Sequence, residues 1–268
     1  MEYQSGKILR LGHLMNSHSN RTLIVAIDHG LGGSPRGLEN LEQSLAKIIS
    51  GEPDAIIMSM GVARRFQKMF FGRGKPSIIV TVDRMLSRTI PGREFRGEAY
   101  RQIVKVEDAL KIGADAVKMA LVFGQDEPDV HADNIKIAAE ISAECEKWHI
   151  PFLLEPVLWG MTADEDDRKD SKITEHICRI AFELGADLLK VRYTGDVESF
   201  SRIVENCPIP IVILGGSKMP TEEDVFATVK DAIQAGAAGV AFGRNVFQHE
   251  DPGKMIRSLR KIIHGESV

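Results

Sequence analysis

Short apolar runs recur along the chain, and segments with helical periodicity separate them. Four of these runs follow a turn: GEPDAIIM at 51–58, GADAVKM at 113–119, GADLLKV at 185–191 and GAAGVAF at 236–242. Glycine suits the position just after a helix, where the backbone φ is positive. The Val, Ile, Leu and Ala residues that follow show little alternation, which is typical of parallel strands covered by helices. The four copies therefore predict repeated strand–helix units.

Four further apolar runs bring the predicted strands to eight: 22–27, 77–82, 151–156 and 210–216. Apolar positions at helical spacing predict helices at 38–50, 100–112, 132–148, 173–184, 223–235 and 253–263. Eight strands alternating with helices over roughly 250 residues is the pattern of a TIM (β/α)8 barrel. We therefore expect an α/β protein with a single barrel domain spanning 1–268. A doubly wound open sheet is the structural alternative, but no strand leads into the GxGxxG turn that dinucleotide binding requires.

Composition narrows the class of partner. The chain has 268 residues, 43% of them hydrophobic and 27% charged, with a formal net charge of −4. This balance argues against a nucleic-acid binder, which presents a basic face, and favours a small-molecule ligand. No apolar run approaches the ~20 residues of a membrane span, and the first residues lack the apolar core of a signal peptide. We expect a cytoplasmic homo-oligomer that contacts no membrane, with its three separated cysteines reduced.

Charged residues interrupt several of the predicted strands near their C-terminal ends, where TIM barrels build their active sites. Strand alternation places Lys190 and Arg192 on the inner face of the sixth strand, Lys118 on the fourth and Glu155 on the fifth, with Asp28 at the end of the first. A lysine attacks a ketone only when neutral, and burial or a nearby cation lowers its pKa. Carboxylates beside it exchange protons with the intermediates. The pattern predicts Schiff-base chemistry, with Lys190 as the nucleophile and Glu155, Lys118 and Asp28 as proton-transfer groups.

Glycines follow the seventh and eighth strands, where TIM barrels commonly bind phosphate. Gly215, Gly216 and Gly243 allow the backbone to approach an anion, and Arg244 can contact two of its oxygens. We expect these four residues to bind a substrate phosphate, and Lys218 to be a solvated loop lysine.

Other polar residues near strand ends have less specific roles. His29 either orients Asp28 or contacts substrate. Arg192 either pairs with a neighbouring group or holds a substrate oxygen. Asp83 and Arg84 end the third strand, and either contact substrate or pair with each other. The remaining histidines are scattered and form no ligand cluster, so we expect a metal-independent enzyme without a cofactor. The acidic segment 162–171 is predicted to be a solvated loop, with a lid after the fifth strand as the alternative.

Nearly the whole chain resembles the class I aldolases of the deoxyribose-phosphate and tagatose-bisphosphate aldolase superfamily. The motifs AIDHG, LLKVRYTGD, ILGGSK and FGRNVFQ are similar to those of archaeal-type fructose-bisphosphate aldolases and aminodideoxyheptulosonate synthases. GADAVKM and FLLEPV are similar to the tagatose-bisphosphate and sulfofructosephosphate aldolases. The resemblance implies that Lys190 forms the Schiff base, that Asp28 transfers protons and that the glycines and Arg244 bind phosphate. It also implies that Lys118 and Glu155 assist the chemistry.

One motif departs from the archaeal-type pattern. Those enzymes carry a catalytic tyrosine in a Tyr-Pro-Arg-Gly motif after the fifth strand, where this chain reads EPVLWGM at 155–161. We therefore assign acid–base catalysis to Glu155 with Lys118. Tyr193 faces away from Lys190 by strand alternation, and Trp159 is a candidate for the wall of the pocket.

These observations favour a metal-free class I aldolase that reversibly cleaves a phosphorylated ketose to dihydroxyacetone phosphate and an aldehyde. A Schiff-base transferase is the first alternative, acting either like the heptulosonate synthases or by thiolase-like acyl transfer to coenzyme A. A relative that binds or regulates with little catalysis is the second.

Overall fold

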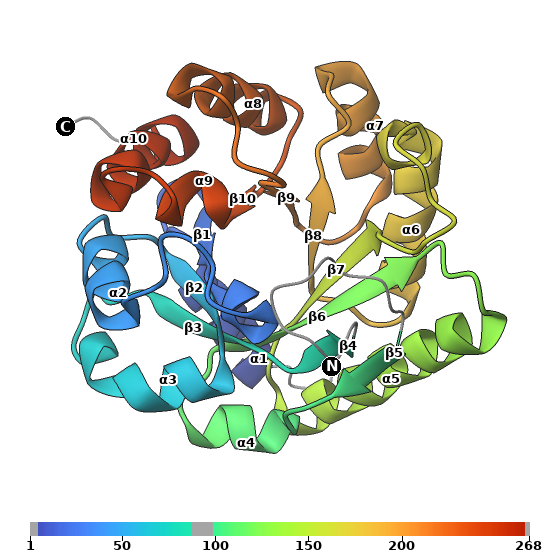
Figure 1. Cartoon of the computed structure of the whole chain (residues 1–268), viewed down its shortest axis with the longest axis horizontal. Helices are drawn as coiled ribbons and strands as arrows, with labels where there is room; N and C mark the ends of the chain where they lie inside the picture. Colours follow the sequence, from blue (N-terminus) through green and yellow to red (C-terminus); the bar gives the residue numbers. More distant parts are fainter. Residues whose placement is uncertain (1–4, 87–98, 266–268) are drawn as a thin grey trace.

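A closed barrel of eight parallel strands forms the centre of the protein (Figure 1). The computed structural model describes residues 5–86 and 99–265. Around the barrel the strands follow the order β1-β10-β9-β8-β7-β6-β3-β2. Their bounds are β1 Thr22–Ala26, β2 Ala55–Ser59, β3 Ser77–Thr81, β6 Ala116–Phe123, β7 Phe152–Leu158, β8 Leu188–Arg192, β9 Ile211–Leu214 and β10 Gly239–Phe242. All eight predicted strands are confirmed, and with them the TIM-barrel architecture.

Helices form the outer ring (Figure 1). They are α2 Leu41–Ile49, α3 Met60–Phe66, α4 Val106–Lys111, α5 Pro128–Trp148, α6 Ser171–Glu183, α7 Val197–Asn206, α8 Glu222–Gln234, α9 Arg244–Phe247 and α10 Pro252–His264, with α1 Ser5–Leu14 preceding the barrel. Short 3-10 helices occupy Asp28–Gly32, Gln67–Phe70 and Asp167–Lys169.

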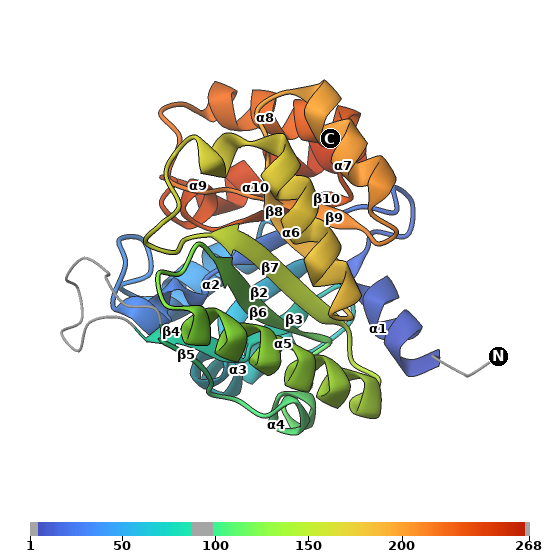
Figure 2. The ribbon, with the colours of Figure 1, turned by 90° about the vertical axis from the view of Figure 1, so that its right-hand side faces the viewer.

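Strand alternation separates two apolar cores. The residues that face outward pack beneath the helices, whereas those that face inward fill the lower half of the barrel. The inner set comprises Ile24, Ala26, Ala55, Ile57, Ile79, Ala116, Leu153, Leu188, Val212 and Ala241. Leu14 of α1 closes this core from below, so α1 covers the N-terminal end of the barrel, opposite the hairpin of β4 and β5 (Figure 2). The polar inward positions lie above this apolar plug.

Residues 100–112 do not form the single helix that their periodicity predicts. Instead β5 (Ala99–Gln102) pairs antiparallel with β4 (Asp83–Leu86), and only Val106–Lys111 is helical. Tertiary contacts override the local pattern: Tyr100 is 1% exposed and belongs to an apolar cluster with Ala120, Val122 and Val157. The backbone N–H groups of 103 and 104 donate to the Val82 carbonyl, which holds the segment extended.

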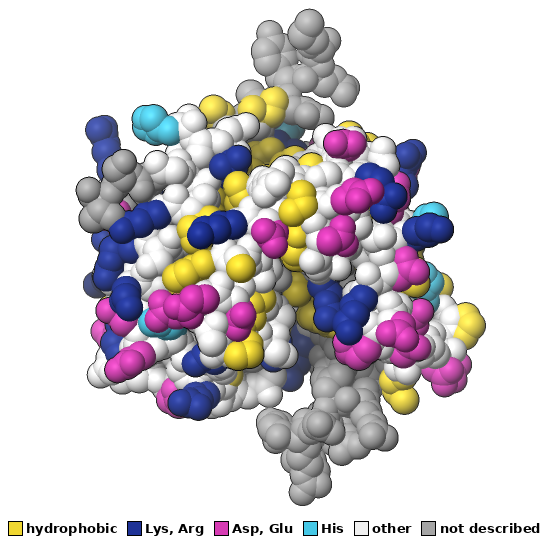
Figure 3. Space-filling view, turned by 90° about the horizontal axis from the view of Figure 1, so that it is seen from above, with side chains coloured by type: hydrophobic (Ala, Val, Ile, Leu, Met, Phe, Trp, Pro, Cys, Tyr) yellow, Lys and Arg dark blue, Asp and Glu magenta, His cyan; other side chains and the backbone are white. Residues whose placement is uncertain are grey.

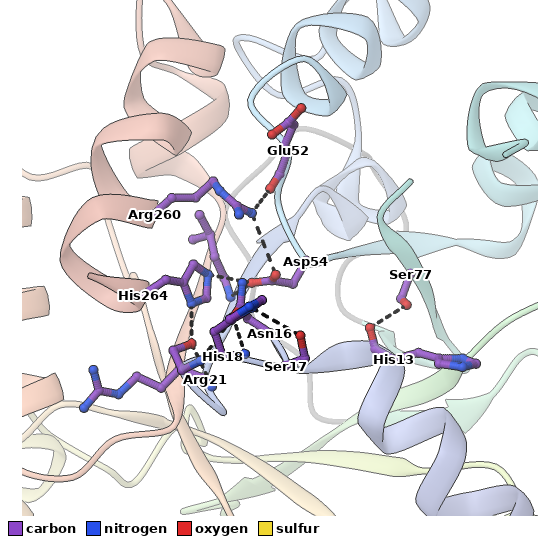
Figure 4. A network of polar contacts seen from close by, with 12 residues as sticks. His13, Asn16, Ser17, His18, Arg21, Glu52, Asp54, Ser77, Arg260 and His264 are labelled. Atoms are coloured by element: carbon purple, nitrogen blue, oxygen red, sulfur yellow. Dashed lines mark hydrogen bonds and ion pairs between the residues drawn. The ribbon is translucent and has the colours of Figure 1, made fainter. Parts of the chain in front are cut away.

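A polar network fastens the C-terminal helix to the lower end of the barrel (Figure 4). The His264 side chain is 1% exposed; its Nε2 lies 3.0 Å from Asp54 Oδ2 and its Nδ1 lies 2.7 Å from Ser19 Oγ. Asp54 Oδ2 also accepts the Leu23 N–H at 2.6 Å, at the start of β1. One carboxylate therefore joins α10 to the first strand.

The His264→Ala variant is expected to unfold more easily, because it leaves Asp54 and Ser19 without their shared partner. A hydrogen bond to a charged group contributes about 1.5–3 kcal/mol, so we expect a loss of about that size in the free energy of unfolding. Urea denaturation measures it, and His18→Ala, at an exposed loop position, is the control. Equal stability of the two variants would contradict a stabilising role for this network.

Candidate active site

Two lysines share one carboxylate inside the upper half of the barrel. Lys190 Nζ on β8 lies 2.8 Å from Glu155 Oε1, and Lys118 Nζ on β6 lies 2.8 Å from Glu155 Oε2. All three side chains are at most 8% exposed. Inward alternation on three adjacent strands points these side chains at the same volume, as the sequence analysis expects. Arg192, which the sequence analysis places on the same inner face as Lys190, lines the cavity described below, whereas these three residues do not.

Asp28 joins the cluster from the end of β1. Its Oδ2 lies 3.5 Å from Lys118 Nζ and accepts a hydrogen bond from Thr81 Oγ1 at 2.8 Å. The Nδ1 atom of His29 lies 3.8 Å from Asp28 Oδ1, and the His29 ring packs edge-on against Phe247. Thr81 was not among the predicted site residues; the only signal for it was its inward position at the end of a strand.

The charges in this cluster compensate one another. Burial alone raises the pKa of Asp28, but the cations Lys118 and Lys190 outweigh it and lower that pKa to about 2. The same two cations outweigh burial at Glu155 and hold its pKa below the usual range. Burial lowers the pKa of Lys118, yet Glu155 and Asp28 raise it above its ordinary value. Lys118 is therefore a permanent cation, and both carboxylates are ionised at neutral pH.

The glycines after β9 and β10 are required by close contacts. At Gly243 a Cβ would lie 2.5 Å from the His29 ring and 2.8 Å from the Ala26 carbonyl oxygen. Gly216 adopts a φ of +60°, which favours glycine. Arg244, the first residue of α9, is half-buried, and its Nε is buried without a hydrogen-bond partner among the described residues. A cation with an unsatisfied donor beside these turns suits an anionic ligand.

Buried Asn245, which the sequence analysis did not single out, braces these turns. Its Nδ2 donates to the Gly215 carbonyl at 2.9 Å, and its Oδ1 accepts the Met219 N–H at 2.7 Å. One amide thus holds the loop after β9 against the start of α9. Asn245 belongs to the FGRNVFQ motif, but the sequence does not indicate which backbone groups its side chain binds.

A cavity of about 650 Å³ opens at the carboxyl ends of β7, β8 and β9. Gly215, Gly216, Arg192 and Arg244 line it, as does Trp159, which is 48% exposed. The sequence favours a packing role for Trp159, with a place in the pocket wall as the alternative; the structure places it in the wall. Seen from above relative to the view of Figure 1, the surface carries basic and acidic side chains mixed together (Figure 3).

The acidic segment 162–171 is more structured than a solvated loop. Arg168 Nε donates to the Leu158 carbonyl at 2.8 Å, and Glu165 pairs with Arg168 at 2.7 Å and with Arg192 at 3.8 Å. Glu165 and Arg168 line the cavity. Local acidity predicted exposure correctly for most of the segment, but gave no sign that Arg168 ties it to the end of β7.

Several secondary expectations are resolved. Lys218 is exposed, as predicted, and its Nζ donates to the Gln248 carbonyl at 2.9 Å. Asp83 is buried and accepts the Ala120 N–H at 3.2 Å. Tyr193 packs edge-on against Phe200 beneath α7, as its outward position predicts, although it also borders the cavity.

The side chains of the cluster do not have the arrangement of a metal site. Across residues 5–86 and 99–265, no group of three or more His, Cys, Asp or Glu side chains is placed to hold a metal ion. The carboxylates of the cluster are instead paired with ammonium groups.

Comparisons with known proteins agree with this architecture. The model of the DeoC/LacD family aldolases matches residues 22–249. An uncharacterized aldolase of Saccharolobus solfataricus is 36% identical over 97% of this chain and 94% of its own length. The 2-amino-4,5-dihydroxy-6-oxo-7-(phosphonooxy)heptanoate synthase of Streptomyces griseus is 33% identical over 97% of this chain and 91% of its own.

Among solved structures, an archaeal fructose-1,6-bisphosphate aldolase superposes with a TM-score of 0.81 at 25% identity. The match covers 97% of this chain and 100% of that one, whose catalytic lysine is covalently bound to the carbinolamine intermediate of its substrate. The chain therefore belongs to the DeoC/LacD aldolase family and is a class I aldolase.

Proposed function

We propose that the protein reversibly cleaves a phosphorylated ketose to dihydroxyacetone phosphate and an aldehyde, through a Schiff base on Lys190. The observation that carries the proposal is the pair of 2.8 Å contacts that Glu155 makes with Lys190 and Lys118. A nucleophilic lysine needs an adjacent proton acceptor, and Glu155 is in hydrogen-bond contact with its amine.

The reaction begins when Lys190 transfers a proton to Glu155 and its neutral amine attacks the ketone carbon. Lys118 stays protonated, so it stabilises the oxyanion of the carbinolamine as it forms. A proton then passes from the attacking nitrogen to the oxyanion, which gives the neutral carbinolamine. Glu155 returns its proton to the carbinolamine hydroxyl, which leaves as water, and an iminium ion forms. The iminium accepts the electron pair of the adjacent carbon–carbon bond, so the aldehyde departs and an enamine remains. Protonation of the enamine and hydrolysis of the imine release dihydroxyacetone phosphate and restore the amine of Lys190.

Only one lysine is suited to the nucleophilic role. Lys118 contacts both Glu155 and Asp28, and these carboxylates raise its pKa, so it holds its proton. Among the contacts that the structure describes, Lys190 pairs with Glu155 alone. Lys190, which contacts a single carboxylate, is therefore the amine that one proton transfer to Glu155 converts to a nucleophile.

The glycine turns and Arg244 support a phosphate on the substrate. The cavity joins them to Arg192, whose side chain is 45% exposed and borders the same volume. Arg192 is therefore assigned to a polar group at the far end of the substrate, where it exchanges the contact with Glu165 for one with the ligand. His29 lies between Asp28 and Gly243 and contacts the substrate near the bond that breaks.

A transferase is the second candidate, since the Streptomyces griseus relative is a synthase and no tyrosine follows Glu155 on β7. In that case the enamine attacks a second acceptor instead of a proton. Ketose cleavage with no acceptor present separates the two, because only the aldolase completes turnover.

The proposal also covers the cellular location and the oligomeric state of the enzyme. We place it in the cytoplasm, where the thiols of Cys145, Cys178 and Cys207 remain reduced. No helix among the described residues is long and apolar enough to cross a membrane. We also propose a homo-oligomer, because Ile8 and Leu9 of α1 are more than 60% exposed.

Lys190→Ala is expected to abolish cleavage of fructose 1,6-bisphosphate, because no other amine is both held against Glu155 and free to lose its proton. A coupled assay for dihydroxyacetone phosphate measures the rate, with a metal chelator present to test metal independence at the same time. Lys136→Ala, a surface change on α5, is the control and should retain the wild-type rate. Undiminished turnover by Lys190→Ala would refute the proposed mechanism.

Asn245→Ala is expected to weaken substrate binding more than the chemical step, because it releases the loop after β9 from α9. We expect KM for the phosphorylated ketose to rise about tenfold, which corresponds to a loss of about 1.4 kcal/mol, with kcat changed much less. Steady-state kinetics measure both constants. A fall in kcat at unchanged KM would show that this loop does not bind the phosphate.

A further inference from the structure

Asp83 is a buried carboxylate that the mechanism above does not use. It is 4% exposed, and its Oδ2 accepts the Ala120 N–H at 3.2 Å. Its Oδ1 is buried and has no hydrogen-bond partner among the described residues. Buried polar atoms are almost always paired, and an exception beside a catalytic cluster indicates a role in binding or chemistry.

The registers of the barrel place Asp83 in the same row as the two central site residues. Thr81 lies opposite Lys118 in the ladder between β3 and β6, so Asp83 lies level with Ala120, as its hydrogen bond to Ala120 requires. Ala120 in turn lies opposite Glu155. Because Leu153 lies opposite Leu188, Glu155 is level with Lys190.

The row therefore contains Asp83, which lies just beyond the end of β3, followed by Ala120 on β6, Glu155 on β7 and Lys190 on β8. Adjacent strands lie about 4.8 Å apart, so the small side chain of Ala120 leaves a gap between the two acids. Lys118 lies one inward position below that gap. The charges of Lys118, Glu155 and Asp28 all act on Asp83, so Asp83 borders the cluster on the side of Lys118 that is away from Lys190.

Cleavage of the carbon–carbon bond needs a group to accept the proton of the substrate hydroxyl. Glu155 already exchanges protons with the Lys190 amine and the carbinolamine, and Asp28 is ion-paired with Lys118. Asp83 has no ion pair within 4.0 Å among the described residues. The archaeal-type enzymes use a tyrosine after the fifth strand, and this chain has none there.

We propose that Asp83 is the acid–base residue that accepts this proton, an assignment that depends on the proposed function. The carboxylate of Asp83 takes the proton of the hydroxyl on the carbon that becomes the aldehyde. The electrons of the O–H bond form the new carbonyl, and those of the broken carbon–carbon bond pass into the iminium to give the enamine. In the condensation direction the protonated Asp83 returns its proton to the new hydroxyl, so no oxidant or co-reactant is needed.

Charged groups from three elements act on Asp83. Burial raises its pKa to about 6; Lys118 on β6 opposes this rise, whereas Asp28 after β1 and Glu155 on β7 add to it. Tyr100 of β5 lies on the same side of the hairpin as Asp83. A base must be ionised to act, so the rate should fall as the pH decreases through about 6, where Asp83 becomes protonated.

The Asp83→Asn variant tests the assignment, because its amide oxygen can still accept the Ala120 N–H. Two reactions are compared: borohydride trapping of dihydroxyacetone phosphate on Lys190, which needs the imine alone, and cleavage of fructose 1,6-bisphosphate. We expect trapping close to the wild-type extent and a cleavage rate reduced about 10²- to 10⁴-fold. The decrease in rate below about pH 6 should disappear from the variant's profile.

The control is Asp115→Asn, in which a carboxylate that accepts the Ile78 N–H at the other end of β3 is changed in the same way. It should retain wild-type cleavage. In a second variant, Asp83→Ala, added formate can replace the missing carboxylate and should restore part of the cleavage rate. This test does not depend on the asparagine side chain. Cleavage by Asp83→Asn within tenfold of wild type, or an equal loss of trapping and cleavage, would overturn it. A wild-type protein that traps no substrate would instead refute the proposed Schiff base itself.

Discussion

The shared carboxylate of Glu155 is the interaction on which the site depends. Two ammonium groups inside a barrel are costly to bury, and each must find a hydrogen-bonded counter-charge. Glu155 serves both, and Asp28 adds a second negative charge, so two lysines face two carboxylates. The side chains of Lys118, Glu155 and Lys190 are at most 8% exposed, and this burial strengthens each of these contacts. The cluster is thus the polar core of the upper barrel and, in the proposed mechanism, the group of residues that transfers protons.

Strand alternation made much of this site predictable. Lys190, Lys118 and Glu155 interrupt apolar runs, and a period of two places each on the inner face without knowledge of the fold. The same reasoning failed where contacts between distant segments decide. The segment 100–112 reads as a helix, yet the burial of Tyr100 against β6 makes its first part a strand. The row from Asp83 to Lys190 depends on how neighbouring strands are aligned, and this alignment cannot be predicted from the sequence of any one strand.

Membership of the family establishes that the protein is a class I aldolase, but it does not establish which substrate the protein uses. The archaeal aldolase whose catalytic lysine is bound to the carbinolamine superposes over nearly the whole chain, whereas the Streptomyces griseus relative is named as a synthase. The residues proposed to hold the phosphate and those proposed to form the iminium come from separate strands, so substrate choice can change while the lysine cluster is kept.

The most direct test of the account is to treat the protein with dihydroxyacetone phosphate and borohydride, and to map the adduct by peptide mass spectrometry. The account predicts a single modified residue, Lys190, with Lys118 unmodified because its two carboxylates keep it protonated. An adduct on Lys118, or adducts spread over surface lysines with none on Lys190, would contradict it.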